Sequence, residues 1–418
     1  MVADIVLLIQ HAAAVVTPGM VGPLSGKQQG TLAIIPDGAI ACAAGRIVAV
    51  GPTDEVRAAV AVGPGTRILD ATGCVVTPGL VDAHTHVVYA GERVAEFELR
   101  AAGATYAEIL AAGGGIHRTV QATRQASLSD LVVQTSRRLD RMLGSGTTTA
   151  EAKSGYGLDC ETELKQLAIM ADDLANHPLE LVPTYLGAHA VPPGQDADSY
   201  IQLIVDTMLP AVAAQGIARF CDIFCEVGVF SREQSERLLR AGLAYGLRPK
   251  IHADEFANTG GALLAAQLGA ISADHLHHAH DDGLRALAVS GTVAVLLPGT
   301  NAFLGLTEQA PARRMVELGV PVALGTDFNP GSCPSASLAL MMSLAVCQLR
   351  LSPAEALVAA TANAAAACGL GDRLGRLAPG YQADMVLWEG TDYREIAYYI
   401  GANLARVVIK KGQVVAPP

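Results

Sequence analysis

The chain has 418 residues, of which 51% are hydrophobic and 4% aromatic, and its formal net charge is −11 at pH 7. That length is sufficient for one large hydrophobic core and a smaller one. The sequence has a negative net charge and no cluster of Lys and Arg, which argues against nucleic acid and anionic membranes as partners.

The cysteine pattern and the N-terminal residues indicate the cellular compartment. The eight cysteines contain no Cys-x-x-Cys pair of a structural zinc site and no pattern typical of a disulfide framework. The first residues lack the basic start of a secretory signal peptide, and no apolar run reaches the roughly 18 residues of a membrane span. We therefore expect a cytoplasmic protein with reduced cysteines.

Short strands separated by Gly, Pro and Asp are predicted at both ends of the chain. They cover 5–9, 38–42, 46–50 and 67–70 at the first end, and 383–388, 405–410 and 413–415 at the other. Lys411-Gly412 is predicted as a hairpin turn between the last two. We expect residues 1–77 and 378–418 to form one composite β-sandwich domain.

The middle of the chain, 78–377, alternates strands with amphipathic or Ala/Leu-rich helices, the clearest of which cover 127–143, 231–245 and 260–268. The predicted strands are 80–88, 147–153, 180–187, 218–225, 248–253, 270–275, 292–298 and 320–327. Eight such units in about 300 residues indicate an α/β fold, a (β/α)8 TIM-like barrel.

An open, doubly wound sheet is the alternative architecture. Its phosphate-binding glycine motif is missing, because Gly113-Gly-Gly115 follows no predicted strand. We expect these glycines to form a loop or a helix start over the barrel mouth.

Metal-ligating side chains fall at the ends of the predicted strands. His84 and His86 point to one face of a strand, because residues i and i+2 do so. His252 ends the fifth strand and Asp327 the eighth, and these ends form the mouth of a barrel. Three imidazoles and one carboxylate suit zinc or iron. We therefore expect one divalent or trivalent metal ion per chain on these four residues.

Two further residues at the mouth are candidates for proton transfer. Glu255 and His275 also follow strands and are not needed as ligands. A bound metal ion would lower the pKa of a water molecule towards about 7 and polarise a substrate oxygen. Glu255 and His275 could then move a proton from that water to a leaving nitrogen.

Each of these residues also has an interpretation without catalysis. Asp327 could cap the helix after the eighth strand, and a buried histidine can simply be hydrogen-bonded. Asp274 could only orient a neighbour, and Lys153 could be a structural ion-pair partner. Only His275 of the run after the sixth strand lies at a strand end, and we expect the others on a surface helix or loop: His277, His278 and His280.

The segment Pro78-Gly-Leu-Val-Asp-Ala-His-Thr-His86, with the histidine of the fifth strand and the aspartate of the eighth, resembles the amidohydrolase superfamily. The composite β domain is similar too. Dinuclear members carry a carboxylated lysine at the end of the fourth strand. Here that strand ends in Cys221-Asp-Ile-Phe-Cys-Glu226, without a lysine, which favours a single metal ion.

Longer strings narrow the resemblance to the imidazolonepropionase family and cover most of the chain. They are Glu96-Phe-Glu98, Ala112-Gly-Gly-Gly-Ile116, Glu151-Ala-Lys-Ser-Gly-Tyr-Gly157, Tyr185-Leu-Gly-Ala-His-Ala-Val-Pro-Pro193, His252-Ala-Asp-Glu255, Ala270-Ile-Ser-Ala-Asp-His275 and Thr326-Asp-Phe-Asn-Pro-Gly331. The resemblance implies hydrolysis of the cyclic amide C–N bond of 4-imidazolone-5-propanoate to N-formimidoyl-L-glutamate in histidine degradation. It also implies a cytoplasmic homodimer that uses zinc or iron.

The same resemblance implies roles for individual residues. Arg93 matches the residue that binds the propanoate, and a guanidinium offers a fork of donors to a carboxylate. Glu255 matches a contact to the substrate ring, and His275 matches a water-activating base. In the implied reaction, water activated by the metal attacks the ring carbonyl, and Asp327, His275 and Glu255 handle protons. The remaining substrate-contacting positions are Tyr156, His189, Asn329, Gly331 and Ser332, the last being the least specific match.

Two other functions share parts of this pattern. A deaminase acting on a cytosine-like or guanine-like ring has the same metal and proton-transfer residues, but Arg93 and Tyr156 have little purpose for an uncharged base. A non-catalytic scaffold that had lost its metal site would not keep all four ligands. Ammonia release would support the first alternative, and absence of metal the second.

Overall fold

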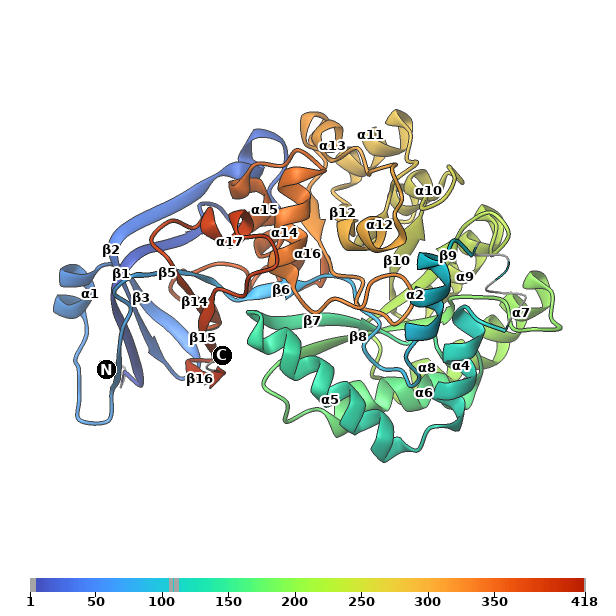
Figure 1. The fold of residues 1–418 in the computed structure, drawn as a ribbon, viewed down its shortest axis with the longest axis horizontal. Helices are drawn as coiled ribbons and strands as arrows, with labels where there is room; N and C mark the ends of the chain where they lie inside the picture. The colour runs from blue at the N-terminus through green and yellow to red at the C-terminus, as the bar shows by residue number, and fades with distance from the viewer. Residues whose placement is uncertain (1–4, 105–107, 109–112, 417–418) are drawn as a thin grey trace.

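The computed structural model describes residues 5–104, 108 and 113–416 of the chain. The described residues form a β domain and a barrel that lie side by side (Figure 1). The predicted β domain extends to 1–4 and 417–418, and the string Ala112-Gly-Gly-Gly-Ile116 begins at Ala112. These positions lie outside the described residues.

The barrel sheet contains eight parallel strands that follow one another in chain order. They are β6 (Leu80–Asp82), β7 (Thr147–Lys153), β8 (Glu180–Ala188), β9 (Phe220–Cys225), β10 (Arg248–Ala253), β11 (Ser272–His275), β12 (Val293–Leu296) and β13 (Val322–Leu324). A parallel bridge between Thr85 and Phe328 joins the first strand region to the last. The amides of Asp327 and His86 donate across this bridge at 3.0 Å each. The predicted (β/α)8 barrel is confirmed, and the open sheet is wrong.

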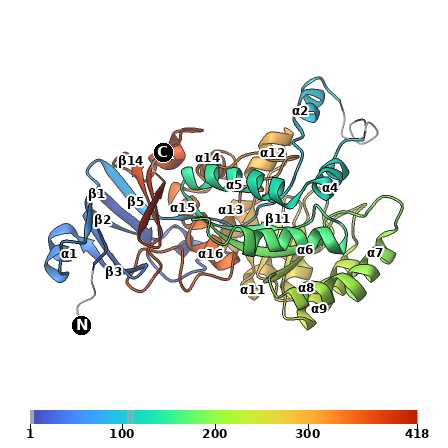
Figure 2. The same cartoon turned by 90° about the horizontal axis from the view of Figure 1, so that it is seen from below.

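Helices cover the outside of the barrel and the loops at its mouth (Figures 1 and 2). They are α2 (Val94–Ala101), α4 (Ile116–Gln125), α5 (Leu128–Gly144), α6 (Cys160–Ala168), α7 (Ala197–Leu203), α8 (Leu209–Gln215), α9 (Arg232–Ala244), α10 (Gly261–Gln267), α11 (Asp281–Ser290), α12 (Pro298–Leu304), α13 (Ala312–Leu318), α14 (Leu338–Cys347), α15 (Pro353–Ala359) and α16 (Ala362–Ala367). Side chains fix where several begin: Ser127 caps α5, and Asp159 caps α6. The three helices predicted from the sequence match α5, α9 and α10 to within one residue at each end.

Several strands are shorter than the apolar runs from which they were predicted. Apart from the bridge between Thr85 and Phe328, the first, predicted over 80–88, is a strand only over Leu80–Asp82, and the eighth, predicted over 320–327, only over Val322–Leu324. Both faces of these strands are buried, so hydrophobicity does not mark where the ladder stops. Asp327 has a φ of 52°, a left-handed conformation that ends the extended backbone.

The β domain is built from both ends of the chain. Its strands are β1 (Leu7–Pro18), β2 (Leu32–Ala43), β3 (Arg46–Pro52), β4 (Arg67–Asp70), β5 (Cys74–Pro78), β14 (Met385–Glu389), β15 (Ala405–Lys410) and β16 (Gln413–Ala416), and α1 (Thr53–Ala59) and α17 (Glu395–Tyr398) accompany them. The order is β16-β15-β14-β5-β1-β2-β3, with β4 also on β1. Antiparallel pairing of β14 with β5 joins the two ends of the chain.

A separate hydrophobic core fills this β-sandwich, with Leu7, Ile40 and Met385 among its members. The turn at Lys411-Gly412 is confirmed, because Lys410 pairs with Gln413. β5 was missing from the predicted strands, and β1 and β2 extend well beyond 5–9 and 38–42. In the extensions of β1 and β2, residues such as Gln10, His11, Pro36 and Asp37 interrupt the alternating apolar pattern that marks a strand. The domain boundaries at 77/78 and 377/378 stay a prediction.

Two general features complete the fold. All eight cysteines are free. Among the described helices, none has both the length and the apolar character that crossing a membrane requires.

Candidate metal centre and active site

Four predicted ligands converge at the mouth of the barrel. His84 and His86 follow β6, His252 lies in β10, and Asp327 follows β13; each is at most 3% exposed. The Nε2 atoms of His84 and His86 are 3.2 Å apart, and Oδ1 of Asp327 lies 3.6 Å from the first and 3.5 Å from the second. Two ligands of a tetrahedral zinc ion lie about 3.4 Å apart. These three atoms are therefore spaced as ligands of one ion.

The second oxygen of Asp327 is occupied by hydroxyl groups. Thr300 Oγ1 donates to Oδ2 at 2.7 Å, and Ser332 Oγ does so at 3.2 Å. This arrangement leaves Oδ1 to face the histidines. The nearest following helix, α14, is capped by Ser337. The interpretation of Asp327 as a helix cap is therefore wrong.

Carboxylates occupy the Nδ1 sides of two of the histidines. Nδ1 of His84 lies 2.6 Å from Oδ2 of Asp274, and Nδ1 of His252 lies 3.1 Å from Oδ2 of Asp222. A carboxylate at Nδ1 holds the proton there and leaves Nε2 as a lone-pair donor.

The Nε2 atom of His252 is buried without a hydrogen-bond partner. Leaving a buried polar group unpaired costs about 1–3 kcal/mol. An unpaired nitrogen beside two imidazoles and a carboxylate is a donor set that fits a metal ion. The described residues therefore fit a single metal ion.

The cluster contains more candidate ligand atoms than one ion needs. Three overlapping sets each have their ligand atoms within 4.8 Å of one another: His84, His252 and His275; His86, His189 and His252; and His84, His86 and Asp327. His252 belongs to two sets, and its ring centroid lies 4.6 Å from that of His84. The geometry brings the four predicted ligands together, while the choice among the sets stays a prediction.

Burial sets the charge state of the cluster. Burial, with smaller contributions from neighbouring positive groups, lowers the pKa of His84, His86 and His275 well below the ordinary value. These imidazoles are neutral, which is the form that binds metal ions. Burial raises the pKa of Asp327 to about 6, against the opposing effect of the Thr300 hydroxyl.

Glu255 and His275 lie next to each other at the edge of this cluster. Oε1 of Glu255 is 3.4 Å from Nδ1 of His275. Burial, followed by the negative charges of Asp327 and Glu226, raises the pKa of Glu255 well above the ordinary value. The pair therefore combines a protonated carboxyl group with a neutral imidazole, which suits proton transfer in either direction.

The backbone that carries this pair is in an uncommon conformation. His275 has a φ of 74°, Leu276 of 64° and Asp254 of 52°. Asp254 accepts from the amides of Thr259, at 2.8 Å, and Ala262, at 3.0 Å, and so ties Glu255 to the start of α10. Left-handed residues other than glycine persist where the surroundings hold them, commonly at functional sites.

Tyr156 and His189 lie on neighbouring loops beside the predicted metal ligands. The His189 ring stacks on that of His86 with centroids 4.8 Å apart, and the Tyr156 ring lies 5.4 Å from that of His189. Nδ1 of His189 is 3.0 Å from the Gly155 carbonyl. Gly155 has a φ of 105°, and a Cβ there would lie 2.9 Å from that nitrogen. Glycine is therefore required for the two loops to meet.

Arg93 lies over the turn after β13 and is held there by the buried Glu96. Its Nε donates to Oε2 of Glu96 at 2.9 Å, and Oε1 of Glu96 accepts from the Gly115 amide at 3.0 Å. A Cβ on Gly331 would lie 2.0 Å from Nη1 of Arg93, so the guanidinium passes directly over this glycine. Gly115 also precedes α4 as its first flanking residue, as expected for a helix start.

The remaining predicted contacts lie in the turn after β13. Oδ1 of Asn329 accepts from the amides of Gly331, at 2.7 Å, and Ser332, at 2.8 Å. Nδ2 of Asn329 donates to the Asp327 carbonyl at 2.7 Å. Asn329 thus shapes the turn that carries Gly331 and Ser332, and any contact of these residues with a substrate stays a prediction.

The other histidines of the run after β11 belong to none of the candidate ligand sets, although the His277 ring lies 5.9 Å from that of His275. His277 and His278 are half-buried in the turn, and Nε2 of His278 is 3.2 Å from Glu308. His280 is exposed and precedes α11. The expected loop position is correct, although burial lowers the pKa of His277 to about 4.

Supporting residues were missed by sequence reasoning. Asp222, Thr300 and Glu96 contact a predicted site residue but had no role assigned. Asp222 could have been noticed, because it is a charged residue within the apolar strand Phe220–Cys225. Thr300 and Glu96 carry no such local signal.

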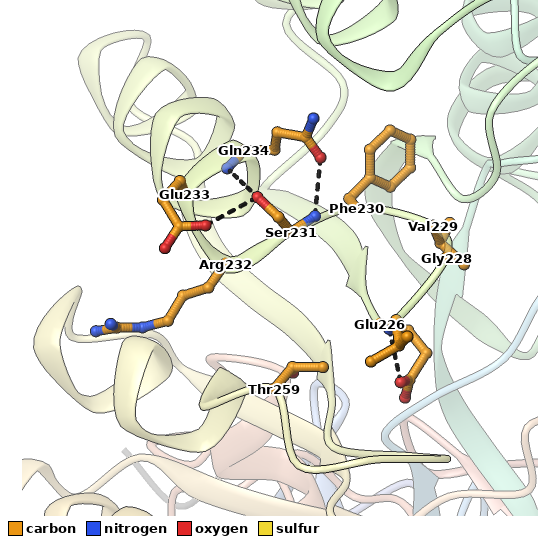
Figure 3. Close-up of a pocket in the computed structure, with 10 residues that line it drawn as sticks. Glu226, Gly228, Val229, Phe230, Ser231, Arg232, Glu233, Gln234 and Thr259 are labelled. Atoms are coloured by element: carbon orange, nitrogen blue, oxygen red, sulfur yellow. Dashed lines mark hydrogen bonds between the residues drawn. The ribbon is translucent and has the colours of Figure 1, made fainter.

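An open hollow of about 480 Å³ lies outside this cluster, between the loop after β9 and the start of α9 (Figure 3). Ser231 caps α9 there: its Oγ accepts from the Gln234 amide at 3.2 Å. None of the metal cluster lines the hollow. Glu226 at its edge accepts from the Phe256 amide at 2.8 Å and so supports the loop that carries Glu255.

Comparison with known proteins identifies the family. The chain is 51% identical over 414 residues to the imidazolonepropionase of Geobacillus kaustophilus (strain HTA426), covering 98% of this chain and 97% of that protein. It is 50% identical to the imidazolonepropionase of Chloroflexus aggregans (strain MD-66 / DSM 9485), covering 98% of each chain. The chain belongs to the imidazolonepropionase family. It is accordingly a hydrolase of the amidohydrolase superfamily, and that part of the prediction is confirmed.

Family models agree with this membership. Residues 228–415 match the amidohydrolase family, and residues 38–59 match the imidazolonepropionase-like composite domain of bacteria. Among solved structures, a zinc-bound adenosine deaminase from Xanthomonas campestris has a TM-score of 0.72 at 20% identity and covers 99% of this chain and 93% of that one. E. coli guanine deaminase has a TM-score of 0.72 at 17% identity, covering 98% and 99%. These structures share the fold.

Proposed function

We propose that this enzyme hydrolyses the cyclic amide C–N bond of 4-imidazolone-5-propanoate and produces N-formimidoyl-L-glutamate. The observation that carries the proposal is the position of Arg93, which reaches over Gly331 at the edge of a neutral histidine cluster. A site built for an uncharged ring has no use for a guanidinium there, whereas a substrate with a propanoate tail does. Family membership supports the same substrate.

The proposed ligands are His84, His86, His252 and Asp327, holding one zinc or iron ion. When bound, that ion lowers the pKa of a water molecule and polarises the substrate carbonyl. Asp274 and Asp222 keep Nε2 of His84 and His252 directed at the ion. Thr300 fixes which oxygen of Asp327 is available.

Arg93 and the residues around it orient the substrate. Its guanidinium binds the propanoate, and Glu96 holds its Nε so that the Nη atoms face that carboxylate. Tyr156 and His189 border the ring on one side, and the turn after β13 borders it on the other through Asn329, Gly331 and Ser332. Fixing both ends of the substrate places the carbonyl carbon in reach of water and reduces the entropic barrier.

Proton transfer falls to His275 and Glu255, with Asp327 as a further acceptor. Neutral His275 takes a proton from the attacking water, and protonated Glu255 gives one to the ring nitrogen as the C–N bond breaks. The 3.4 Å separation of His275 Nδ1 from Glu255 Oε1 then allows the imidazolium to return its proton to the carboxylate. The two groups thereby regain their starting states.

The test is turnover of freshly prepared 4-imidazolone-5-propanoate by purified enzyme of known metal content. We expect about one metal ion per chain and loss of the imidazolone absorbance without release of ammonia. One ion with no imidazolone turnover, but ammonia from a cytosine-like or guanine-like base, would assign the site to a deaminase. A chain that bound no metal would indicate a scaffold.

We also propose that the enzyme works in the cytoplasm as a homodimer. The eight free cysteines suit a reducing compartment. Light scattering during gel filtration tests the oligomer, and a mass of one chain at micromolar concentration would contradict it.

A further inference from the structure

A buried lysine lies beneath the metal centre and contacts three carboxylates. Lys153 ends β7 and is fully buried. Its Nζ is 2.8 Å from Oε1 of Glu151, 2.8 Å from Oδ2 of Asp222 and 3.4 Å from Oδ2 of Asp274. A buried charge of this kind is tolerated only when paired and hydrogen-bonded.

Two of these carboxylate oxygens are the same atoms that contact metal-ligating histidines. Oδ2 of Asp222 lies 3.1 Å from Nδ1 of His252, and Oδ2 of Asp274 lies 2.6 Å from Nδ1 of His84. The Lys153 ammonium therefore contacts one oxygen of Asp222 and one of Asp274. Each of these oxygens also contacts a proposed ligand, and the two ligands come from different strands.

We propose that Lys153 is a positioning residue for the metal centre: it holds Asp222 and Asp274 in place, and through them orients the rings of His252 and His84. This role rests on the single-ion site of the proposed function and goes beyond it. The outer partners of metal-ligating histidines set ring orientation and ligand basicity. A cation shared by two such partners couples the two ligands to each other.

Direct participation of Lys153 in the reaction does not fit its surroundings. Its Nζ is enclosed by carboxylates and has no exposure to the mouth. Burial alone would lower the pKa of Lys153, but the surrounding carboxylates, that of Asp222 first, raise it above the ordinary value. The ammonium stays charged and exchanges no proton with a substrate.

Lys250 provides a matched control for Lys153. It is also a fully buried barrel lysine, and its Nζ donates to Ser272 Oγ at 2.9 Å and lies 4.0 Å from Glu151. It has no ion pair with Asp222 or Asp274. Its loss removes a buried charge from the same core without removing the partner of either carboxylate.

The experiment compares zinc affinity of the metal-free wild type, Lys153→Met and Lys250→Met by chelator competition. We expect Lys153→Met to weaken zinc binding by about 10- to 100-fold, the effect of losing outer-partner contacts. Lys250→Met should stay within about threefold of wild type. The visible spectrum of the cobalt-loaded protein should change for Lys153→Met alone, because ligand orientation changes. Equal effects of the two lysine variants would overturn the proposal.

A second set of variants covers a failure of Lys153→Met to fold. Asp222→Asn removes the negative charge but keeps an oxygen for His252, and the double variant Lys153→Met/Asp222→Asn leaves fewer unpaired charges. If Lys153 acts through Asp222, the double variant should weaken zinc binding less than the product of the two single effects. Effects that multiply would overturn the proposal. Wild type that bound no zinc or ferrous ion would instead overturn the metal site itself.

Discussion

Two clusters of buried and half-buried charged side chains lie at opposite ends of the barrel, and they differ in whether their polar atoms are paired. At the base, Lys410 of β15 is 2.7 Å from Asp384 and 3.3 Å from Glu180 at the start of β8, and Glu180 also pairs with Arg373. At the mouth, Nε2 of His252 and Nδ1 of His275 have no hydrogen-bond partner.

This difference in hydrogen bonding indicates that the base cluster is structural and that the mouth cluster is functional. The base cluster is complete without a ligand, and it joins the barrel to the β-sandwich. The mouth cluster leaves buried nitrogens unpaired, which native proteins rarely do without an ion, a water or a catalytic role. Both clusters contain carboxylates, but only the mouth cluster contains histidines, and only there do buried nitrogen atoms lack a hydrogen-bond partner.

The largest expected effect is the loss of the metal ion from the mouth cluster. Removal of the ion with a chelator, or the substitution His252→Ala, should lower turnover by at least about 1,000-fold, because water activation and carbonyl polarisation are both lost. Metal content and turnover are measured on the same samples. His177→Ala, which removes a histidine paired with surface Asp140, should retain both. Full activity after complete metal removal would contradict the account.

The proton-transfer pair should show a different pattern from the ligands. Glu255→Gln removes a titrating carboxyl group of similar shape, and we expect kcat to fall by about 100- to 10,000-fold. Metal content should remain near that of wild type, because Glu255 lies outside the three candidate ligand sets. Loss of metal from Glu255→Gln, measured by elemental analysis, would instead make this residue a ligand.

Arg93 should affect substrate binding more than turnover. Arg93→Met removes a charge-assisted contact worth roughly 1.5–3 kcal/mol, which corresponds to an increase in KM of about 10- to 100-fold. The control is Arg100→Met in α2, the helix that follows Arg93, because the Arg100 guanidinium lies 4.6 Å from the ring centroid of Phe303 in α12. A KM equal to wild type in Arg93→Met would remove the propanoate contact from the account.

The base cluster should affect stability and its pH dependence, without a direct effect on chemistry. Burial raises the pKa of Glu180, but Lys410 and Arg373 outweigh it and lower the pKa to about 2. Because this value lies below the unfolded one of about 4.3, the carboxylate stabilises the fold above that pH. The contribution disappears as the pH falls through about 2.

Glu180→Gln should therefore lower the free energy of unfolding by about 2 kcal/mol at neutral pH, with the difference shrinking below pH about 4.3. Thermal unfolding across this pH range measures it. Glu236→Gln, which removes an exposed pair with Arg240, should cost less than about 0.5 kcal/mol. An equal effect of both variants would mean that the base cluster contributes no more than a surface pair.

The features that depend on local sequence patterns could be predicted from the sequence. Alternating apolar segments predicted the barrel, and His84, His86, His252 and Asp327 were recognisable because each follows or ends an apolar run. The outer partners were not predictable in the same way. Asp222 meets His252, and Thr300 meets Asp327, only because parallel pairing sets β9 beside β10 and β12 beside β13.

The lengths of the strands could not be predicted from local sequence patterns either. The apolar run from Leu80 continues past the last residue of the β6 ladder, because the residues that follow β6, through Val88, are also buried. Their hydrogen bonds run between β6 and β13 through the bridge at Thr85. Asp and His adopt a positive φ more often than most residues, but their residue types do not single out Asp327 and His275, which do so here. Closure of the barrel and packing around the site impose both features.

The most direct test of the central claim is an anomalous-diffraction map of zinc-loaded crystals, collected on both sides of the zinc edge. The account predicts one peak per chain, bound by Nε2 of His84, His86 and His252 and by Oδ1 of Asp327. A peak shared by His86, His189 and His252 without Asp327, or two peaks in one barrel, would contradict it.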